Sequence, residues 1–479
     1  MSKIKILDNF LIASDKKMSD AMLKLNENIR GICFVVDDRK IVGIVTDGDI
    51  RRAILNNFSK DDVISEFMNK EFISLPSDST NNKIRDSLSS KIKYIPLINK
   101  LGEITDFASY ENYRTIPVME PKLSQNASLY VQECIDTNWI SSKGKYVTKF
   151  EDEFSKINRN YKALSVSNGT VALHLALISL GIGKGDEVIV PNFTFAASIN
   201  SIIHSGATPI IIDVEPDTWC INAKQIEKVV TPRTKAIMPV HLYGMPCKID
   251  EIMSIAKTLN LFVIEDCAEA IGSKWKNTPV GTFGDAATFS FFGNKTITTG
   301  EGGMIIFKND KNFKKAKILR DHGMSSKKKY WHDYVGYNYR MTNLQAAVGV
   351  SQMEQFDQII NKKREIAYRY SENLKDLSSI EKLPMDNENT FHSYWLYSIQ
   401  LKKTIDRDNL ISKLLNEGVE ARPVFYALNE MPVYKAFAGL SDFPVSRNIT
   451  NTSLSLPSSL NLDEAQIDHV CFVLKKSLS

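Results

Sequence analysis

The sequence predicts an α/β protein in which a largely parallel sheet, covered by helices on both faces, follows a smaller α/β module. From residue 160 onward, short apolar runs alternate with helical segments, as expected of parallel strands joined by crossover helices. Before residue 115, a strand–strand–helix pattern occurs twice. A chain of 479 residues is also too long for one domain, so two or three are expected.

Composition and charge exclude several classes of protein. A net charge of +4 over 479 residues gives no basis for binding nucleic acid. The six cysteines form no C-x-x-C pair and the seven histidines no H-E-x-x-H, so neither a metal site nor a disulfide framework is expected. The N-terminus is polar, and no apolar run approaches membrane-spanning length. We therefore expect a cytoplasmic protein with no membrane partner.

The repeat occupies the first 114 residues. Its first copy is GICFVVDDRKIVGIVTDGDIRRAIL and its second is IKYIPLINKLGEITDFASYENY, each expected to form two strands and a helix. A helical segment precedes each copy, MSDAMLKLNENI in the first case and NNKIRDSLSSK in the second. Because a unit of this size cannot bury its own apolar face, the two copies are expected to pair.

The first copy resembles a CBS motif, and the two copies together resemble a CBS pair. In that family, the threonine and aspartate of GIVTDGD, here Thr46 and Asp49, contact the phosphate and ribose of a nucleotide. A hydroxyl at a helix N-terminus suits phosphate, and a carboxylate can accept hydrogen bonds from two hydroxyls. The second copy has Ser109 and Asn112 at these positions, so a nucleotide is expected at the first half-site alone. In the alternative interpretation, Asp49 caps the helix IRRAIL and the module serves dimerisation.

The second part begins after YRTIPVMEPKL, a predicted linker because Pro117 and Pro121 interrupt regular structure. Expected strands are DEVIVP, TPIIIDV, AIMPVHLYG, LFVIED, AATFSFF and GGMIIF, with TVALHLALISLG and KIDEIMSIAKTLN among the helices between them. In such sheets ligands bind at the carboxyl ends of the strands. Polar and aromatic residues follow the strands there, namely NFTFAAS, His241, Tyr243, Asp266, Ser290, Asn294 and Lys295.

Lys295 lies in FSFFGNKTITTGEGGM, between an aromatic run and a glycine cluster, with few carboxylates near it in sequence. A lysine beside a ligand pocket loses its proton more easily, and its neutral amine can form a Schiff base with an aldehyde. Pyridoxal phosphate is such an aldehyde, and its ring nitrogen needs a carboxylate, which Asp266 can provide. Taken alone, Lys295 would be a solvated loop lysine and Asp266 a surface residue.

Pyridoxal phosphate also needs a phosphate cradle and an aromatic face. The segment SNGTVALHLAL provides Gly169 for close backbone approach, the Thr170 hydroxyl and the amides of a helix N-terminus. Ser290 can add a second hydroxyl, and Phe195 of NFTF an aromatic ring. Each feature alone has an ordinary structural explanation, a capped helix or a core phenylalanine. Their combination with Lys295 and Asp266 in this order favours a pyridoxal phosphate site.

Residues from about 115 to 479 resemble the DegT/DnrJ/EryC1/StrS family of sugar aminotransferases, which are fold type I pyridoxal phosphate enzymes acting on nucleotide-linked ketosugars. The motifs WISSKGKYVTKFEDEF, VSNGTVALHLAL, EDCAEAIGS, FSFFGNKTITTGEGGM, GYNYRMTNLQAAVG and RPVFYALNEMPVY occur in the family's order. The resemblance implies three domains: 1–114 the CBS pair, 115–360 the large cofactor-binding domain, and 361–479 a small C-terminal α+β domain. The CBS-like extension is absent from ordinary members.

The resemblance also implies roles for individual residues. Lys295 is the Schiff-base lysine, and Asp266 is the partner of the ring nitrogen. Asn338 of GYNYRM is expected to reach the cofactor phosphate of a neighbouring subunit, which implies a homodimer or higher homo-oligomer with shared active sites. The remaining cofactor contacts implied are Gly169, Thr170, Val171 and Ser290 at the phosphate, Phe195 stacking on the ring, and Glu269 near its substituents.

Within the family the motifs are most similar to those of members that aminate C4 of GDP-4-keto-6-deoxy-D-mannose, giving GDP-perosamine for surface polysaccharide such as the O-antigen of lipopolysaccharide. L-Glutamate is the amino donor, and pyridoxamine phosphate forms in its half-reaction. The implied substrate contacts are Trp139, Ser141, Arg340, Arg422 and Asn429. Related enzymes usually have Pro-x-His after RPVFY, whereas this chain has Ala427, Leu428 and Asn429, which leaves the exact sugar and base open.

Three alternatives remain at this point. The first is a 4- or 3-aminotransferase that uses a UDP- or dTDP-ketosugar. The second is a pyridoxal phosphate-dependent sugar dehydratase, which the intact Lys295 disfavours because such members carry histidine there. The third is a nucleotide-sensing regulator without catalysis, which the complete cofactor set disfavours.

Overall fold

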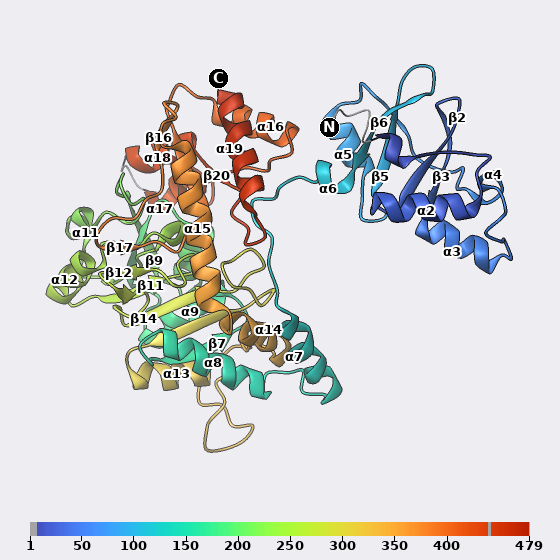
Figure 1. Cartoon of the computed structure of the whole chain (residues 1–479). Helices are drawn as coiled ribbons and strands as arrows, with labels where there is room; N and C mark the ends of the chain where they lie inside the picture. Colours follow the sequence, from blue (N-terminus) through green and yellow to red (C-terminus); the bar gives the residue numbers. More distant parts are fainter. Residues whose placement is uncertain (1–6, 439–441, 479) are drawn as a thin grey trace. The chain divides into compact units, whose positions relative to one another are not determined.

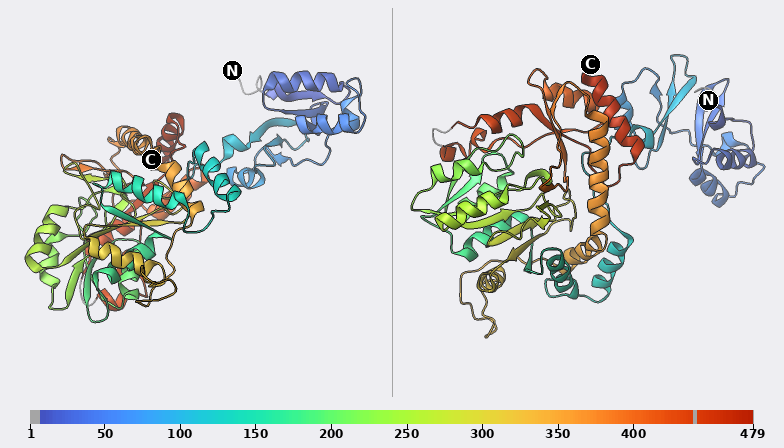
Figure 2. Two further views of the ribbon diagram at one scale, coloured as in Figure 1. Left: turned by 90° about the horizontal axis from the view of Figure 1, so that it is seen from below. Right: turned by 60° about the vertical axis from the view of Figure 1, so that its left-hand side comes forward.

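The computed structural model describes residues 7–438 and 442–478. Its chain forms two units, Met1–Ile116 with Leu415–Gly418, and Pro117–Leu414 with Val419–Ser479 (Figures 1 and 2). Between α6 (Tyr110–Tyr113) and α7 (Gln125–Asp136) the chain has no helix or strand. Within the described ranges, every helix is too short or too polar to cross a bilayer.

The N-terminal unit contains two small sheets of the same design. In each, the first strand pairs in parallel with the second, and the second pairs antiparallel with the third. Phe34 and Phe107, one from each sheet, lie with ring centroids 5.5 Å apart, so the two halves share apolar contacts. The predicted repeat is therefore present. Its elements are η1 (Asp8–Phe10), β1 (Leu11–Ala13), α2 (Met18–Asn28), β2 (Ile32–Asp37), β3 (Lys40–Thr46), α3 (Asp47–Leu55), α4 (Ile64–Phe67), β4 (Leu75–Pro76), α5 (Asn81–Ser87), β5 (Tyr94–Ile98) and β6 (Ile104–Ser109).

A seven-stranded sheet forms the centre of the second unit. In spatial order its strands are β7 (Lys162–Val166), β15 (Gly303–Phe307), β14 (Ala286–Ser290), β11 (Phe262–Asp266), β10 (Thr234–Ile237), β8 (Glu187–Pro191) and β9 (Thr208–Ile212). Strand β15 runs antiparallel to β14 and β7, whereas the other neighbours pair in parallel. The prediction of a largely parallel sheet is confirmed, although β7 was not among the strands predicted.

Helices cover both faces of this sheet because most of its strands are apolar on both faces (Figure 1). Val190, Ile264 and Ile305 belong to the core shared with α9 (Gly169–Leu180), α10 (Ala196–His204) and α13 (Asp310–Arg320). Ala287 and Ile306 point to the opposite face, where α8 (Lys145–Ile157) and α14 (Asn343–Met353) lie. On that face the other end of the sheet packs against α11 (Ala223–Val229) and α12 (Ile249–Leu259).

The C-terminal part is built on an antiparallel sheet ordered β16 (Ile380–Lys382), β18 (Tyr397–Leu401), β20 (Ser453–Leu456) and β19 (Arg422–Pro423). The long helix α15 (Phe356–Leu374) leads into it and packs against α19 (Glu464–Leu478) (Figure 2). This is the small α+β part expected from the sequence. The other elements of the second unit are η2 (Leu242–Gly244), β12 (Lys274–Trp275), β13 (Thr278–Pro279), β17 (Thr390–Phe391), α16 (Arg407–Asn416), η3 (Leu428–Glu430), α17 (Lys435–Ala438) and α18 (Pro444–Thr452).

Candidate active site

A cavity of about 600 Å³ lies at the carboxyl ends of the parallel strands of the central sheet. Asp266 is the last residue of β11 and Ser290 the last residue of β14, whereas Gly169 is the first residue of α9 after β7. Lys295 follows β14 in the next loop, and all four residues line the cavity. Residues separated by up to 126 positions in sequence therefore meet in one place, where ligands bind in sheets of this kind.

The Lys295 amine is largely enclosed, with 13% of its side chain exposed. Its Nζ atom lies 3.7 Å from Oε1 of Glu269 and 3.6 Å from the centroid of the Trp395 ring. Burial lowers the pKa of Lys295, and the nearby carboxylates of Glu269 and Asp266 oppose this effect. Burial therefore favours the neutral amine, the form that attacks an aldehyde.

Asp266 is a buried carboxylate at 3% exposure. Ser198 Oγ donates a hydrogen bond to its Oδ2 at 2.8 Å, and the Ala268 amide donates to its Oδ1 at 3.1 Å. These bonds favour the ionised form, but burial outweighs them and raises the pKa of Asp266. A protonated pyridine nitrogen beside this carboxylate would stabilise the negative charge of Asp266. The environment of Asp266 therefore fits the ring nitrogen of pyridoxal phosphate.

Gly169 and Ser290 form a narrow part of the cavity where α9 begins. A Cβ atom on Gly169 would lie 2.8 Å from Ser290 Cβ and 3.1 Å from its Oγ, so a side chain there would fill the space beside that hydroxyl. Thr170 lines the same place. The amide of Val171 already donates to Oδ1 of Asn168 at 3.0 Å, so Val171 serves the helix cap. This part of the cavity fits a phosphate group, because Gly169 allows close approach to the backbone, Thr170 and Ser290 offer hydroxyls, and α9 presents its N-terminus.

Replacing Gly169 with alanine is expected to weaken cofactor binding. The added methyl group would need to displace Ser290, and overpacking of this kind costs about 1–3 kcal/mol, which corresponds to a roughly 10- to 100-fold rise in the dissociation constant. Titration of the apo-protein with pyridoxal phosphate measures this constant. The control is Gly48→Ala, a helical glycine of the N-terminal unit with its nearest neighbour 3.4 Å from the added atom. Equal affinity in both variants would contradict the phosphate role.

One wall of the cavity is a series of aromatic rings. Phe195 lies 5.6 Å from Phe425, Phe425 stacks on Tyr243 at 5.2 Å, and Tyr243 stacks on Trp395 at 5.9 Å, all between ring centroids. Tyr243 adopts a left-handed backbone conformation with φ of 53°, which is uncommon for a large residue. Its backbone amide donates to Oε2 of Glu269 at 2.9 Å, and its hydroxyl accepts from the Phe425 amide at 3.0 Å. Tyr243 therefore connects Glu269 with Phe425 through hydrogen bonds.

Glu269 lines the cavity between Tyr243 and Lys295. Its side chain is 4% exposed, and burial raises its pKa to about 7. This value lies close to neutrality, so the carboxyl group can hold or release a proton under ordinary conditions.

Sequence reasoning missed three residues that shape this cavity: Ser198, Trp395 and Phe425. Trp395 and Phe425 lie at least 100 positions after Lys295 in the chain. No local pattern marks Trp395, and although Phe425 belongs to the RPVFY motif, nothing in that motif places it beside Lys295. Ser198 lies three residues after Phe195, close enough to be suspected once that loop was placed beside Asp266.

The predicted substrate residues lie elsewhere. Among the described residues that line the cavity, Trp139, Ser141, Arg340, Arg422 and Asn429 are absent. Arg340 forms an ion pair with Asp321 at 2.9 Å and donates to Oδ1 of Asn338, and Arg422 pairs with Glu420 at 2.8 Å. Trp139 is exposed, and the carbonyl of Ser141 accepts a hydrogen bond from the Asn343 amide. Within a single chain, therefore, these side chains and Asn338 do not reach the cavity around Lys295.

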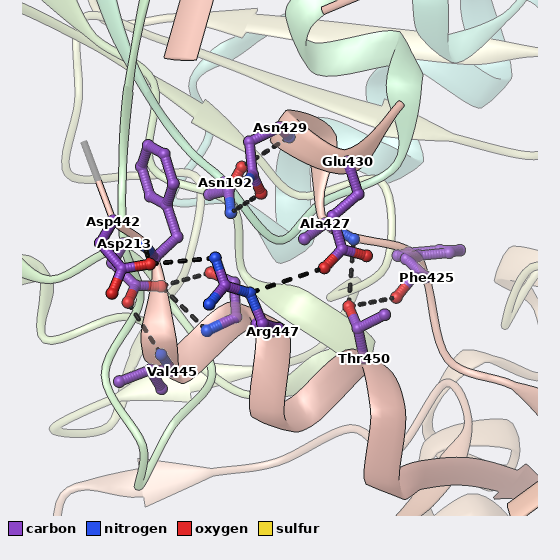
Figure 3. A network of polar contacts seen from close by, with 12 residues as sticks. Asn192, Asp213, Phe425, Ala427, Asn429, Glu430, Asp442, Val445, Arg447 and Thr450 are labelled. Atoms are coloured by element: carbon purple, nitrogen blue, oxygen red, sulfur yellow. Dashed lines mark hydrogen bonds and ion pairs between the residues drawn. The ribbon is translucent and has the colours of Figure 1, made fainter. Parts of the chain in front are cut away.

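Asn429 has a structural partner, as Figure 3 shows. The Asn192 amide nitrogen donates to Oδ1 of Asn429 at 2.8 Å, and the Asn429 backbone amide donates to Oδ1 of Asn192 at 3.0 Å. The Leu428 amide also donates to the Asn192 carbonyl at 2.8 Å. Residues 427–429, which depart from the family pattern, are therefore hydrogen-bonded to the loop that carries Phe195.

A second set of contacts in Figure 3 fixes the same segment from α18. The Ala427 amide donates to Oγ1 of Thr450, and this hydroxyl donates to the Phe425 carbonyl at 3.2 Å. Arg447 approaches Glu430 at 4.0 Å and pairs with Asp442 at 3.0 Å. Phe425 thus has a defined position at the cavity because polar contacts hold the residues that follow it.

In the N-terminal unit, Thr46 and Asp49 contact each other. Thr46 is the N-cap of α3, and its backbone amide and hydroxyl both donate to Oδ2 of Asp49, at 2.8 and 2.7 Å. The other carboxylate oxygen of Asp49 pairs with Arg52. This arrangement is a capping box, which favours the capping interpretation of Asp49. Ser109 is buried at the end of β6, and the side chain of Asn112 lies outside the described residues.

A buried group near β11 has residue types that can bind metals: His241, Glu265 and Cys267. The Cys247 amide donates to Nδ1 of His241, and Nε2 of His241 lies 3.1 Å from Glu265. Glu265 also accepts from the amides of residues 281, 283 and 284. The polar atoms of His241 and Glu265 are already hydrogen-bonded, so the group stabilises the loop around residues 281–284.

The fold and the cavity that Lys295 and Asp266 both line define the site of a pyridoxal phosphate-dependent enzyme. The model of the DegT/DnrJ/EryC1/StrS aminotransferase family matches residues 121–475, and that of the CBS domain matches residues 6–56. The chain belongs to the DegT/DnrJ/EryC1/StrS aminotransferase family. Its cofactor is pyridoxal phosphate.

Two curated relatives are similar over nearly their whole length. GDP-perosamine synthase of Escherichia coli O157:H7 is 48% identical over 356 residues, which cover 74% of this chain and 96% of the relative. GDP-perosamine synthase of Vibrio cholerae is 45% identical over 362 residues, covering 75% and 98%. Among solved structures, that of the "putative sugar aminotransferase Spr1654" from Streptococcus pneumoniae in its pyridoxal phosphate form is 27% identical, with a TM-score of 0.72 over 76% of this chain and 98% of that one.

Proposed function

We propose that this chain transfers the amino group of L-glutamate to C4 of GDP-4-keto-6-deoxy-D-mannose and so forms GDP-perosamine. The observation that carries the proposal is the cavity in which Lys295, Asp266 and Glu269 meet, in a chain 48% identical to a GDP-perosamine synthase. Glutamate as donor and GDP as the nucleotide are supported by the motifs shared with members of that activity. Surface polysaccharide synthesis is the corresponding process.

Each residue of the cavity has its own role in the proposed reaction. Pyridoxal phosphate, when bound, supplies an aldehyde that condenses with amines and a ring that accepts the electron pair of a broken C–H bond. Asp266 holds the ring nitrogen in its protonated form. Nζ of Lys295 removes the proton from the α-carbon of glutamate and later returns a proton to C4 of the sugar. Gly169, Thr170 and Ser290 would hold the phosphate, and Phe195 would provide an aromatic face for the ring.

A panel of ketosugars tests the proposal. The purified protein is given pyridoxal phosphate, L-glutamate and the GDP-, UDP- or dTDP-linked 4-keto-6-deoxysugar, and kcat/KM is measured for each by product mass spectrometry. We expect kcat/KM for the GDP sugar to be at least about 100-fold higher than for the others. A site that hydrogen-bonds one base rejects another strongly, because the wrong base leaves buried polar groups of the site without partners. Preference for a UDP or dTDP sugar would contradict the proposal while keeping the reaction type.

We further propose that the chain works as a homodimer with shared active sites. Asn338 lies outside the cavity of its own chain, and large exposed side chains precede it: Tyr330, Trp331, Tyr334 and Val335. Such exposed apolar groups are typical of protein interfaces.

Mixing two inactive variants tests this arrangement. Lys295→Ala and Asn338→Ala subunits are unfolded, mixed and refolded together. In a hybrid dimer, one of the two sites has both native residues. If pairing is random, about half of the dimers are hybrids, so roughly a quarter of all sites should be active. Each variant refolded alone is the control. Sedimentation of the wild type as a dimer with no recovery in the hybrids would show that the sites are not shared.

A nucleotide at the N-terminal unit is a separate proposal, and Asp49 tests it against the capping interpretation. Asp49→Ala is expected to lower the free energy of unfolding of this unit by about 1 kcal/mol, because it breaks the capping box. Urea denaturation measures this loss, with Asp61→Ala, an exposed aspartate outside the box, as control. Loss of affinity for one nucleotide at unchanged stability would favour the ligand role instead.

A further inference from the structure

Trp395 is in direct contact with the reactive atom of the site. Its ring centroid lies 3.6 Å from Nζ of Lys295, well within the distance at which an ammonium group is attracted to an aromatic face. Its exposure is 4%, and Lys295 is largely buried, so little water weakens the contact. Cation–π attraction is strongest in such desolvated positions.

Three contacts fix Trp395, two through its indole and one through its backbone carbonyl. Its Nε1 donates to the carbonyl of Asn294, the residue before Lys295, at 2.6 Å. Its ring is stacked on Tyr243 with an interplanar angle of 18°. Nζ of Lys363, a buried lysine of α15, donates to the Trp395 carbonyl at 2.8 Å. The face presented to Lys295 is therefore fixed by contacts that do not involve the lysine amine itself.

We propose that Trp395 is a catalytic residue, whose indole face holds the free Lys295 amine in its protonated state between the two proton transfers of each half-reaction. The inference rests on the proposed function only in that an amine substrate displaces Lys295 from the cofactor. No motif of the sequence marks Trp395, and its role follows from the contact alone.

The proton balance defines what Trp395 contributes. The neutral amine of Lys295 takes the proton from the α-carbon of the amino donor and becomes an ammonium group, while the electron pair of the C–H bond passes to the cofactor. The ammonium then gives this proton to the cofactor carbon that keeps the amine, and Lys295 is neutral again. In the second half-reaction the amine takes that proton back and, as an ammonium group, gives it to the carbon of the acceptor. Because the ammonium form exists only after the first transfer, a group that attracts it favours that transfer over the reverse.

Other ionisable groups also face this amine. Glu269 lies 3.7 Å away, Asp266 lies at the end of β11, and His204 and Glu301 line the same cavity. Burial lowers the pKa of Lys295, and the carboxylates of Glu269 and Asp266 raise it. Removing the indole face takes away a further stabilisation of the ammonium form, so the pKa of the amine should fall further.

The apo-protein allows this to be measured without any substrate. Competitive labelling of amines with a trace reagent, from pH 6 to pH 11, gives the midpoint at which Lys295 becomes reactive, read from the labelled peptide by mass spectrometry. In Trp395→Leu we expect this midpoint to fall by roughly one pH unit, and in Trp395→Phe, which keeps a weaker aromatic face, by less. Trp275→Leu is the matched control, because Trp275 is also buried and has Lys276 at 5.6 Å from its ring, outside the cavity.

The glutamate half-reaction gives a second measurement. With α-deuterated glutamate, the isotope effect on cofactor bleaching should increase in both Trp395 variants while KM for glutamate stays within about twofold, since proton removal becomes slower. An unchanged midpoint, or one that rises, would overturn the proposal, as would an unchanged isotope effect. If Trp395→Leu does not fold, Trp395→Phe decides both measurements. A shifted midpoint in a protein that aminates no GDP sugar would leave this proposal standing and contradict the proposed function.

Discussion

Replacing Lys295 with alanine is expected to abolish amination, with a loss of roughly 10³-fold or more, because one side chain serves as covalent anchor and as general base. Its Nζ is the amine that the cavity encloses beside Glu269 and Trp395. Product formation is measured by mass spectrometry. Borohydride reduction of the wild type should attach the cofactor to the peptide containing Lys295, and the variant should carry none.

The matched control is Lys274→Ala. Lys274 is partly buried and lies 5.2 Å from the ring of Phe391, so it resembles Lys295 in its surroundings but lies outside the cavity. We expect this variant to keep its activity and its covalently attached cofactor. Cofactor attached by borohydride to another peptide, with Lys295→Ala still active, would contradict the assignment.

Replacing Asp266 with asparagine should have the second largest effect. Asparagine keeps the size of the side chain, and its one oxygen can still accept the hydrogen bond from either Ser198 or Ala268, but it carries no charge. Removing one partner of a buried charge pair costs about 3–5 kcal/mol, so the rate should fall by a factor between roughly 10² and 10⁴. The reason is that the cofactor ring loses the anion that keeps its nitrogen protonated. The glutamate half-reaction, followed by absorbance, measures this effect.

Asp285→Asn is the control for this variant. Asp285 accepts a hydrogen bond from the Val263 amide at 2.9 Å, at the opposite end of the strand from Asp266. Its replacement should affect stability without slowing the half-reaction. If Asp266→Asn lost cofactor affinity alone and turned over at the wild-type rate when saturated, the carboxylate would be a binding residue without an electronic role.

Much of the fold follows from local pattern. The strands β8, β11, β14 and β15 begin or end within two residues of the apolar runs that predict them, because buried parallel strands are apolar on both faces. Strand β7 has the short sequence KALSV, with a lysine at its start, and this weak signal explains why it was not predicted. The antiparallel direction of β15 depends on long-range pairing that no local pattern encodes.

For the candidate site, the sequence indicated the residues that end strands or begin helices, such as Asp266 and Gly169. It could not indicate which distant side chains complete the cavity. Trp395 comes from a segment about 100 residues after Lys295, and the Asn192–Asn429 pair joins positions 237 apart. The substrate set inferred from resemblance lies outside the cavity of one chain, since its members contact other residues there.

Transfer of nitrogen-15 from L-[¹⁵N]glutamate to GDP-4-keto-6-deoxy-D-mannose would demonstrate the proposed amination of the sugar. We expect the GDP-linked product to carry the label on C4, seen by mass and by the coupling of the nitrogen to that carbon in NMR, and Lys295→Ala to yield no labelled product. A product labelled at C3, or 2-oxoglutarate formed with no label in the sugar, would contradict it.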